Sequence, residues 1–224
     1  NCVWHEPFEN QYSSFLEYYI LRNMLYDNAL HCPNYSKRKF LKKFYGSVLR
    51  QLVYYRYKNI DLIFRGVNDF LKGVNFLKNT DGEQLHKEIM SAGYKAQPME
   101  ELNMPFSYPN YDNSFHENEK KAHRFIRFLS FNGLLFPANR ETIVSMAQCR
   151  PINFYRAKRV LQYDVTSKKG FVTEKQLGKS TIYIFRMIPI TLKILWHFNG
   201  VIRDFHAYGN ELITEEFWKK YLEL

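Results

Sequence analysis

The stretch SKRKFLKKFYGSVLRQLVYYRYKN, residues 36–59, is strongly basic and has the apolar spacing of a single two-faced helix. No acidic residue occurs between Asp27 and Asp61. Eight cations lie in that interval: Lys37, Arg38, Lys39, Lys42, Lys43, Arg50, Arg56 and Lys58. At about 100° per residue one face of the helix is apolar and is expected to pack in a core. The opposite face is predicted to carry Lys39, Lys43, Arg50, Tyr54 and Tyr57.

The cationic face has two interpretations. One is a solvated lysine face that keeps the protein soluble. The other is a ridge that binds the phosphates of a nucleic acid, with the tyrosines as stacking surfaces for unpaired bases. Exposed helix faces commonly mix both signs of charge in pairs four residues apart, and residues 36–59 lack such pairs. The sequence therefore favours the phosphate-binding interpretation.

The composition points to a globular protein with a polyanionic partner. The chain has 224 residues, a formal net charge of +10 and 17% aromatic residues. A surplus of positive charge favours binding to RNA, DNA or an anionic membrane surface. The most apolar run, Ile182 to Trp196, contains Arg186, Lys193 and Pro189 and is shorter than the roughly 20 apolar residues of a membrane span. We therefore predict that no segment crosses a membrane.

Apolar residues at spacings of three and four predict helices along most of the chain. The predicted helices cover residues 13–28, 36–59, 59–79 and 83–91, and then 119–132, 139–147, 151–161, 173–202 and 214 onward. The helix over 173–202 is expected to be buried and kinked at Pro189. Within it, residues 181–188, TIYIFRMI, are β-branched and aromatic enough to suit a strand as well. Gly66 and Gly73 weaken the third helix, and close approach of a neighbouring backbone would compensate for them.

These patterns predict an all-α fold, a multi-helix bundle interrupted by a long insertion rich in Pro, Asn and Tyr. Residues 1–82 form a three-helix unit that includes the basic helix, 83–118 are a flexible insertion, and 119–224 form a helical half that packs on the first. Positive charge recurs between Lys120 and Arg159, where nine cations accompany a single acid, Glu141. We predict that Arg124, Arg127, Arg156 and Arg159 extend the nucleic-acid-binding surface.

The sequence lacks the motifs of an enzyme. Residues 177–181, LGKST, resemble the end of a phosphate-binding loop, but Thr173 stands where that motif requires a glycine, so we interpret them as the start of a helix. The seven histidines and three cysteines lack the spacing of a zinc site. The cysteines are expected to be reduced thiols in an intracellular protein. We predict no catalytic activity, no bound metal and no cofactor.

Two stretches, residues 21–60 and 177–205, resemble the N-terminal region of the Nepro family, the nucleolus and neural progenitor proteins. The resemblance rests on Met24-Leu25-Tyr26-Asp27-Asn28, on the turn from His31 to Asn34 that leads into the basic helix, and on LGKSTIYIFRMIPITLKILWHFNGVI, residues 177–202. Related helical proteins are subunits of the RNase MRP ribonucleoprotein. The resemblance implies an all-helical, RNA-associated protein of the nucleus and nucleolus, a non-catalytic subunit in pre-ribosomal RNA processing.

The turn departs from the family pattern, in which a basic residue adjoins the histidine. Here Cys32-Pro33 follow His31, and basic residues resume only at Lys37. We therefore assign the RNA contacts to the helix itself.

We predict a non-catalytic subunit of an RNase MRP- or RNase P-like ribonucleoprotein that binds structured RNA in pre-rRNA or tRNA processing, alongside other protein subunits. Lys39, Lys43 and Arg50 would contact phosphates, and Tyr54 and Tyr57 would pack on riboses or exposed bases. The alternative is a helical protein-protein scaffold whose basic surface binds an acidic partner. A third interpretation, binding to an anionic membrane surface, is disfavoured because the sequence shows neither a lipidation signal nor a strongly apolar helix expected to be exposed.

Overall fold

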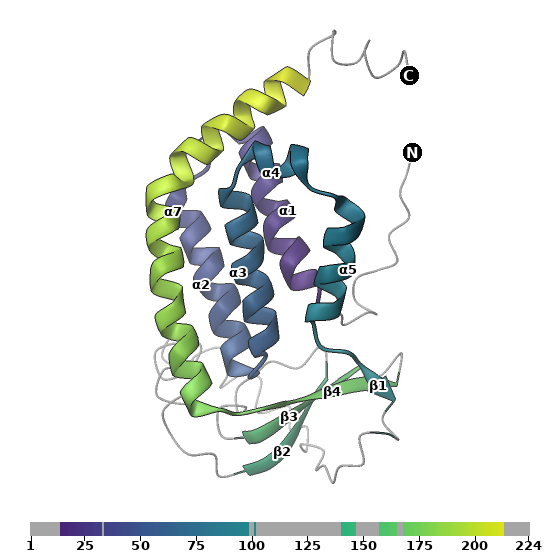
Figure 1. The fold of residues 1–224 in the computed structure, drawn as a ribbon. Coiled ribbons are helices and arrows are strands. Elements are labelled where there is room, and N and C mark those ends of the chain that lie inside the picture. Colours follow the sequence, from purple (N-terminus) through teal and green to yellow (C-terminus); the bar gives the residue numbers. More distant parts are fainter. Residues whose placement is uncertain are drawn as a thin grey trace, which may run out of the picture. The chain divides into compact units, whose positions relative to one another are not determined.

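Six helices and four strands make up most of the described residues, which are 14–32, 34–98, 101, 140–146, 157–164 and 168–212 of this computed structural model (Figure 1). The helices are α1 (Leu16–His31), α2 (Lys37–Val53), α3 (Tyr57–Leu71), α4 (Val74–Asn79), α5 (Gly82–Ala92) and α7 (Leu177–Leu212). The strands are β1 (Gln97–Pro98), β2 (Arg140–Met146), β3 (Ala157–Asp164) and β4 (Lys169–Glu174). The fold is mostly helical, which confirms the predicted fold class.

The chain divides into two compact units, each built from segments that are discontinuous in sequence. The sheet unit comprises Asn1–Ser14, Leu49–Tyr57 and Tyr94–Tyr183. The helical unit comprises Phe15–Val48, Lys58–Gly93 and Ile184–Leu224. The predicted helices over 119–132 and from 214 onward, and most of the predicted insertion, lie outside the described residues.

Aromatic rings from helices distant in sequence meet in the core of the helical unit. Phe40 of α2 stacks on Phe198 of α7 with ring centroids 5.3 Å apart, and Phe70 of α3 stacks on Phe205 of α7 at 5.5 Å. Tyr26 of α1 also meets Phe205, at 5.0 Å. The four phenylalanines are buried, and each ring contributes about 1.5–3 kcal/mol by leaving water. These contacts join α1, α2, α3 and α7, which lie side by side in Figure 1.

Gly66 allows α1 to pack closely against α3. A Cβ atom at this position would lie 3.0 Å from the carbonyl oxygen of Tyr18 and 3.4 Å from its ring. The close approach proposed for Gly66 is thus confirmed. Gly73 instead has a φ of 71° and separates α3 from α4, so the single helix predicted over 59–79 is two helices.

A buried polar contact also joins α1 and α3. The Tyr18 hydroxyl donates to Asp69 Oδ2 at 3.0 Å and accepts from Arg22 Nη1 at 3.1 Å, while Lys72 Nζ lies 2.8 Å from Asp69 Oδ1. Asp69 is buried, so these donors replace the water that its carboxylate loses. Burial raises the pKa of Tyr18 to about 12, because the charged tyrosinate is disfavoured away from water.

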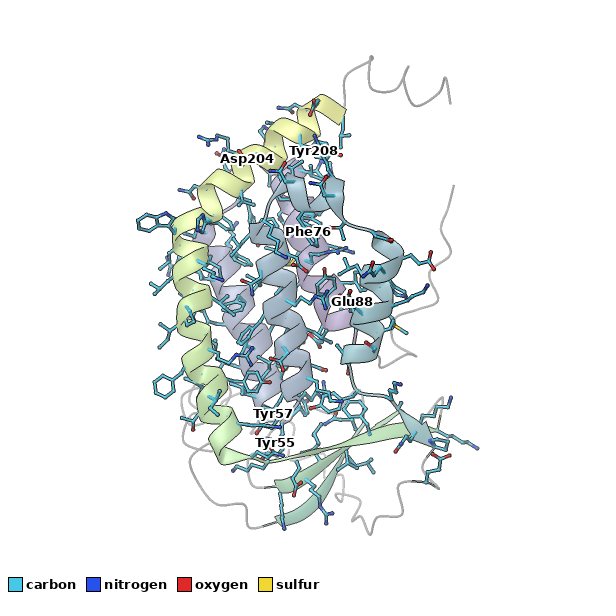
Figure 2. The ribbon with its side chains drawn as sticks, in the orientation of Figure 1. Tyr55, Tyr57, Phe76, Glu88, Asp204 and Tyr208 are labelled. Atoms are coloured by element: carbon cyan, nitrogen blue, oxygen red, sulfur yellow. The ribbon has the colours of Figure 1, made fainter. Side chains whose placement is uncertain are left out.

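The short helices α4 and α5 complete the helical unit. Asp81 caps α5 by accepting hydrogen bonds from the backbone N–H groups of Glu83 and Gln84, which confirms the short helix predicted over 83–91. Glu88 of α5 pairs with Arg65 of α3 at 2.5 Å. At the far end of α7, the ring of Tyr208 lies under the Lys78 ammonium of α4, 4.9 Å from the ring centroid (Figure 2).

The basic segment is not one helix, because α2 ends in a Schellman turn. The N–H of Arg56 donates to the carbonyl of Gln51 at 2.9 Å, and the N–H of Tyr55 donates to that of Leu52 at 3.1 Å. Tyr55 has a φ of 56°, a conformation in which glycine is usual. The prediction of a continuous helix over 36–59 is therefore wrong, and α3 begins afresh at Tyr57.

The sheet unit corrects three predicted helical segments. The strand order is β1-β4-β3-β2, with β2 and β3 parallel and the other pairs antiparallel. The helices predicted over 139–147 and 151–161 are wrong because β2 and β3 occupy much of those segments, and the helix predicted from Thr173 starts after β4. These segments contain β-branched residues, and spacings of three and four over so few residues do not exclude a strand.

The long helix α7 differs from its prediction in length and burial. It begins at Leu177, which confirms the helix start expected at LGKST, passes through Pro189 and continues to Leu212 rather than to residue 202. The prediction that this helix is buried is wrong for one of its sides, where apolar side chains face solvent and Trp196 is 85% exposed.

We expect replacement of glycine by alanine to change the free energy of unfolding in opposite directions at Gly46 and Gly66. We expect Gly66→Ala to lower the free energy of unfolding by about 1 kcal/mol, since steric crowding against Tyr18 outweighs the gain in helix propensity. Gly46 lies in α2 with no described atom within 4 Å of an added Cβ, so Gly46→Ala should raise that free energy by up to about 1 kcal/mol. Urea unfolding followed by circular dichroism measures both. Equal effects would contradict the close packing at Gly66.

Candidate nucleic-acid interface

The exposed cations of α2 form two rows on different flanks of the helix. The Tyr45 hydroxyl lies 2.7 Å from Thr191 Oγ1, so the flank that carries Tyr45 faces α7. Arg38 and Lys42 precede Tyr45 by seven and three residues and share its flank, and both are exposed. We call Arg38 and Lys42 the α7-side row.

The second row includes the predicted phosphate ligands. Lys39 and Lys43 are exposed and lie four residues apart, and Lys43 Nζ is 2.8 Å from the sulfur of Met24 on α1. We call Lys39 and Lys43 the α1-side row. Arg50 follows Lys43 by seven residues, in the last turn of α2, and is also exposed. The three cations that the sequence singled out are thus accessible to solvent.

The acids at the two ends of the basic interval, Asp27 and Asp61, interact with residues outside α2. Asp27 lies 3.9 Å from His31 within α1, and Asp61 of α3 pairs with Arg186 of α7 at 2.8 Å. Since α2 itself contains no acid, the positive charge of both rows is not balanced within their own helix. Such a surface attracts phosphate groups and releases their counterions on binding.

The tyrosines are not part of this surface. Tyr54 and Tyr57 are 7% and 5% exposed, so the prediction that they share the exposed cationic face is wrong. The ring of Tyr57, labelled in Figure 2, stacks on Tyr183 with centroids 5.5 Å apart, and Arg56 lies over the ring of Tyr54. The Schellman turn at Tyr55 is the cause, because it breaks the helical register that would align these rings with Lys43 and Arg50.

The Tyr57 hydroxyl is held by polar contacts inside the sheet unit. It lies 2.8 Å from Ser180 Oγ, donates to the carbonyl of Gln176 at 3.1 Å and accepts from the Gln176 N–H at 3.1 Å. Burial raises the pKa of Tyr57. These contacts indicate a structural role for the ring and the hydroxyl.

One cation of the basic segment lies in the interior. Arg56 is 7% exposed, and its guanidinium donates to Gln162 of β3 and, at 3.5 Å, to Gln51 of α2. A charge count from the sequence includes Arg56 in the cationic surface, and only the turn after α2 shows that it belongs to the core of the sheet unit.

The predicted second cationic region is only partly described. Arg124, Arg127 and Arg156 lie outside the described residues. Arg159 lies in β3, half-buried, and is opposite Glu174 of β4 in the antiparallel ladder. An acidic neighbour in that register reduces the positive field that Arg159 contributes.

Comparison with models of known protein families finds no match, and comparison with curated proteins finds none either. The resemblance to the Nepro family therefore stays a prediction. Within the described residues, no group of three or more His, Cys, Asp or Glu side chains is placed to hold a metal ion. No helix in that part of the chain is long and apolar enough to cross a membrane.

A conservative change at Tyr57 separates a structural role from a binding role. We expect Tyr57→Phe to lower the free energy of unfolding by about 1–2 kcal/mol, because the change removes a buried hydroxyl with three polar contacts. Affinity for an RNA hairpin should stay unchanged in the folded variant. Urea unfolding and fluorescence anisotropy measure the two effects, and a loss of RNA affinity without a loss of stability would contradict the assignment.

Proposed function

We propose that the protein binds structured RNA through α2, as a non-catalytic subunit of a ribonucleoprotein that acts in pre-rRNA or tRNA processing in the nucleus and nucleolus. The observation that carries the proposal is the α1-side row, whose exposed Lys39 and Lys43 belong to a helix without an acidic residue. Arg50 is the third proposed phosphate ligand.

The burial of the tyrosines supports a proposed mode of contact through phosphates. With Tyr54 and Tyr57 in the interior, α2 offers ammonium and guanidinium groups rather than rings for base stacking. Contacts of this kind read the spacing of phosphates, which is set by the shape of a folded RNA. The proposal therefore favours paired, structured RNA over an unfolded single strand.

Gly46 supports close approach of a ligand to this flank of α2. It follows Lys43 by three residues and precedes Arg50 by four, so it lies on the same side of the helix. An exposed glycine inside a helix costs about 1 kcal/mol relative to alanine, and no described atom occupies the space beside it. An RNA backbone seated between Lys43 and Arg50 would use that space.

The resemblance to the Nepro family supports the assignment to a ribonucleoprotein. The two stretches that carry it, residues 21–60 and 177–205, include α2 and the first 29 residues of α7. The described parts of both stretches are largely helical. The related RNase MRP subunits suggest pre-rRNA as the pathway in which to seek the RNA.

Charge reversal on the two rows of α2 tests the proposal with a matched control. We expect K39E/K43E to weaken binding of a fluorescent RNA hairpin by about tenfold or more, and to reduce the slope of log affinity against log salt by about 2, since two phosphate contacts are lost. R38E/K42E makes the same change in net charge on the α7-side row and should retain most of the affinity.

Both variants alter exposed residues, and circular dichroism checks that they fold. Equal losses in the two variants would mean that general positive charge, not the α1-side row, attracts the RNA. Unchanged binding by K39E/K43E would overturn the proposal. Crosslinking in cells, followed by sequencing of the bound RNA, then identifies the RNA class.

A further inference from the structure

Five apolar side chains of α7 form an exposed stripe within the helical unit. Phe185, Ile188, Leu192, Leu195 and Trp196 are 64%, 53%, 60%, 46% and 85% exposed. Their spacing of three and four residues places them on one side of the helix, over about 16 Å of its length. We call these five residues the α7 stripe.

The α7 stripe lies on a different side of α7 from the residues that pack in the core. Met187, Ile190, Ile194 and Phe198 are buried on that other side. The described residues include nine exposed large hydrophobic side chains, of which six lie on α7 and five form the stripe. Single exposed apolar residues are ordinary, but a contiguous group on one helix marks a surface that binds another molecule.

Cations border the stripe on the side away from α2. Arg186 and Lys193 lie seven residues apart along one edge, and both are exposed. Arg186 also pairs with Asp61, so Lys193 contributes the less compensated charge on this edge. Between Lys175 and Arg203 the chain contains no acidic residue.

A second group of cations lies toward the other edge. Lys37 Nζ donates to the carbonyl oxygen of Leu195 at 3.0 Å, which brings the first residue of α2 to the end of the stripe. Arg38 and Lys42, the α7-side row, lie on the flank of α2 that faces α7. The apolar stripe therefore has positive charge on both of its sides.

We propose that the α7 stripe binds an amphipathic helix of a partner protein, with acidic residues bordering the apolar face of that helix. The spacing of the stripe matches the ridges that pack between helices, and its length corresponds to about three turns of the partner. The cations on both edges would then pair with carboxylates at positions that flank the seam, as they do in charged helix pairs.

The charge pattern distinguishes this partner from a second copy of the chain. Two copies packed stripe to stripe would bring their basic borders together, which like charges oppose. An acidic helix avoids this repulsion and gains attraction at each edge. The inference is independent of the proposed RNA contacts, because it uses a different surface and a different chemistry.

Two designed peptides test the proposal. Each is a helix of about three heptads with Leu on the seam, flanked either by Glu or by Lys. We expect the Glu peptide to bind the full chain at least about tenfold more tightly than the Lys peptide, measured by fluorescence anisotropy. L192D should weaken binding of the Glu peptide by about tenfold or more, because it places a charge in the middle of the seam.

Control variants separate the stripe from general effects. Ile20 of α1 is 58% exposed and lies outside the stripe, so I20D should bind the Glu peptide like the unmodified chain. K193E should weaken binding of the Glu peptide and strengthen binding of the Lys peptide. K39E/K43E should leave binding of the Glu peptide within about twofold, which keeps this test separate from that of the RNA interface.

Three outcomes would overturn the proposal. Equal binding of both peptides would show a generic apolar surface, and loss in I20D equal to that in L192D would show binding elsewhere. Self-association of the full chain that L192D abolishes, in the absence of peptide binding, would assign the stripe to a second copy. Tight binding to anionic phospholipid vesicles that L192D abolishes, again without peptide binding, would assign it to a membrane surface.

Discussion

The ring of Phe198 is the contact on which the arrangement of the helical unit depends. It stacks on Phe40 of α2 at 5.3 Å and also meets Tyr35 at 6.2 Å and Phe70 of α3 at 6.5 Å. Because a close-packed ring has few alternative positions, these contacts fix the rotation of α7 about its own axis. That rotation determines which apolar residues of α7 enter the core and which remain at the surface.

The same packing places the apolar and the cationic side chains of α2 on different sides of the helix. Phe40, Phe44, Val48 and Leu52 are fully buried at intervals of four residues, so the cations are confined to the remaining sides of the helix. The α1-side row then lies apart from the α7-side row, which adjoins the apolar stripe. We therefore propose a different ligand for each flank of α2, an RNA on one and an acidic helix on the other.

The core of the sheet unit includes four consecutive buried residues, Tyr54, Tyr55, Arg56 and Tyr57. Tyr54, Tyr55 and Arg56 form the turn between α2 and α3, and Tyr57 is the first residue of α3. Their backbone and side chains contact β3, β4 and the start of α7. A turn that is buried on this scale is part of a core, not a loop for recognition. The cationic surface of α2 therefore ends at Arg50.

The sequence by itself determined the main helices of the helical unit. The helices predicted over 13–28 and 83–91, and much of those predicted over 36–59 and 59–79, are present because apolar spacing is a local signal and local hydrogen bonds satisfy the backbone of a helix. The exposure of Lys39, Lys43 and Arg50 also followed from the sequence, because the opposite face of α2 is apolar.

Only the tertiary structure decided the strands, the turn at Tyr55 and the outward face of α7. Residues 140–146 and 157–164 are strands because each finds a partner elsewhere in the chain, and pairing of this kind leaves no local signature that spacing alone can separate from a short helix. The segment Ile182 to Trp196 is apolar on nearly every side, so its periodicity could not identify the side that faces the core. Phe40 and Phe70 pack on Phe198, and these contacts turn the Phe198 side of α7 toward the core. The apolar residues on the opposite side remain exposed and form the α7 stripe.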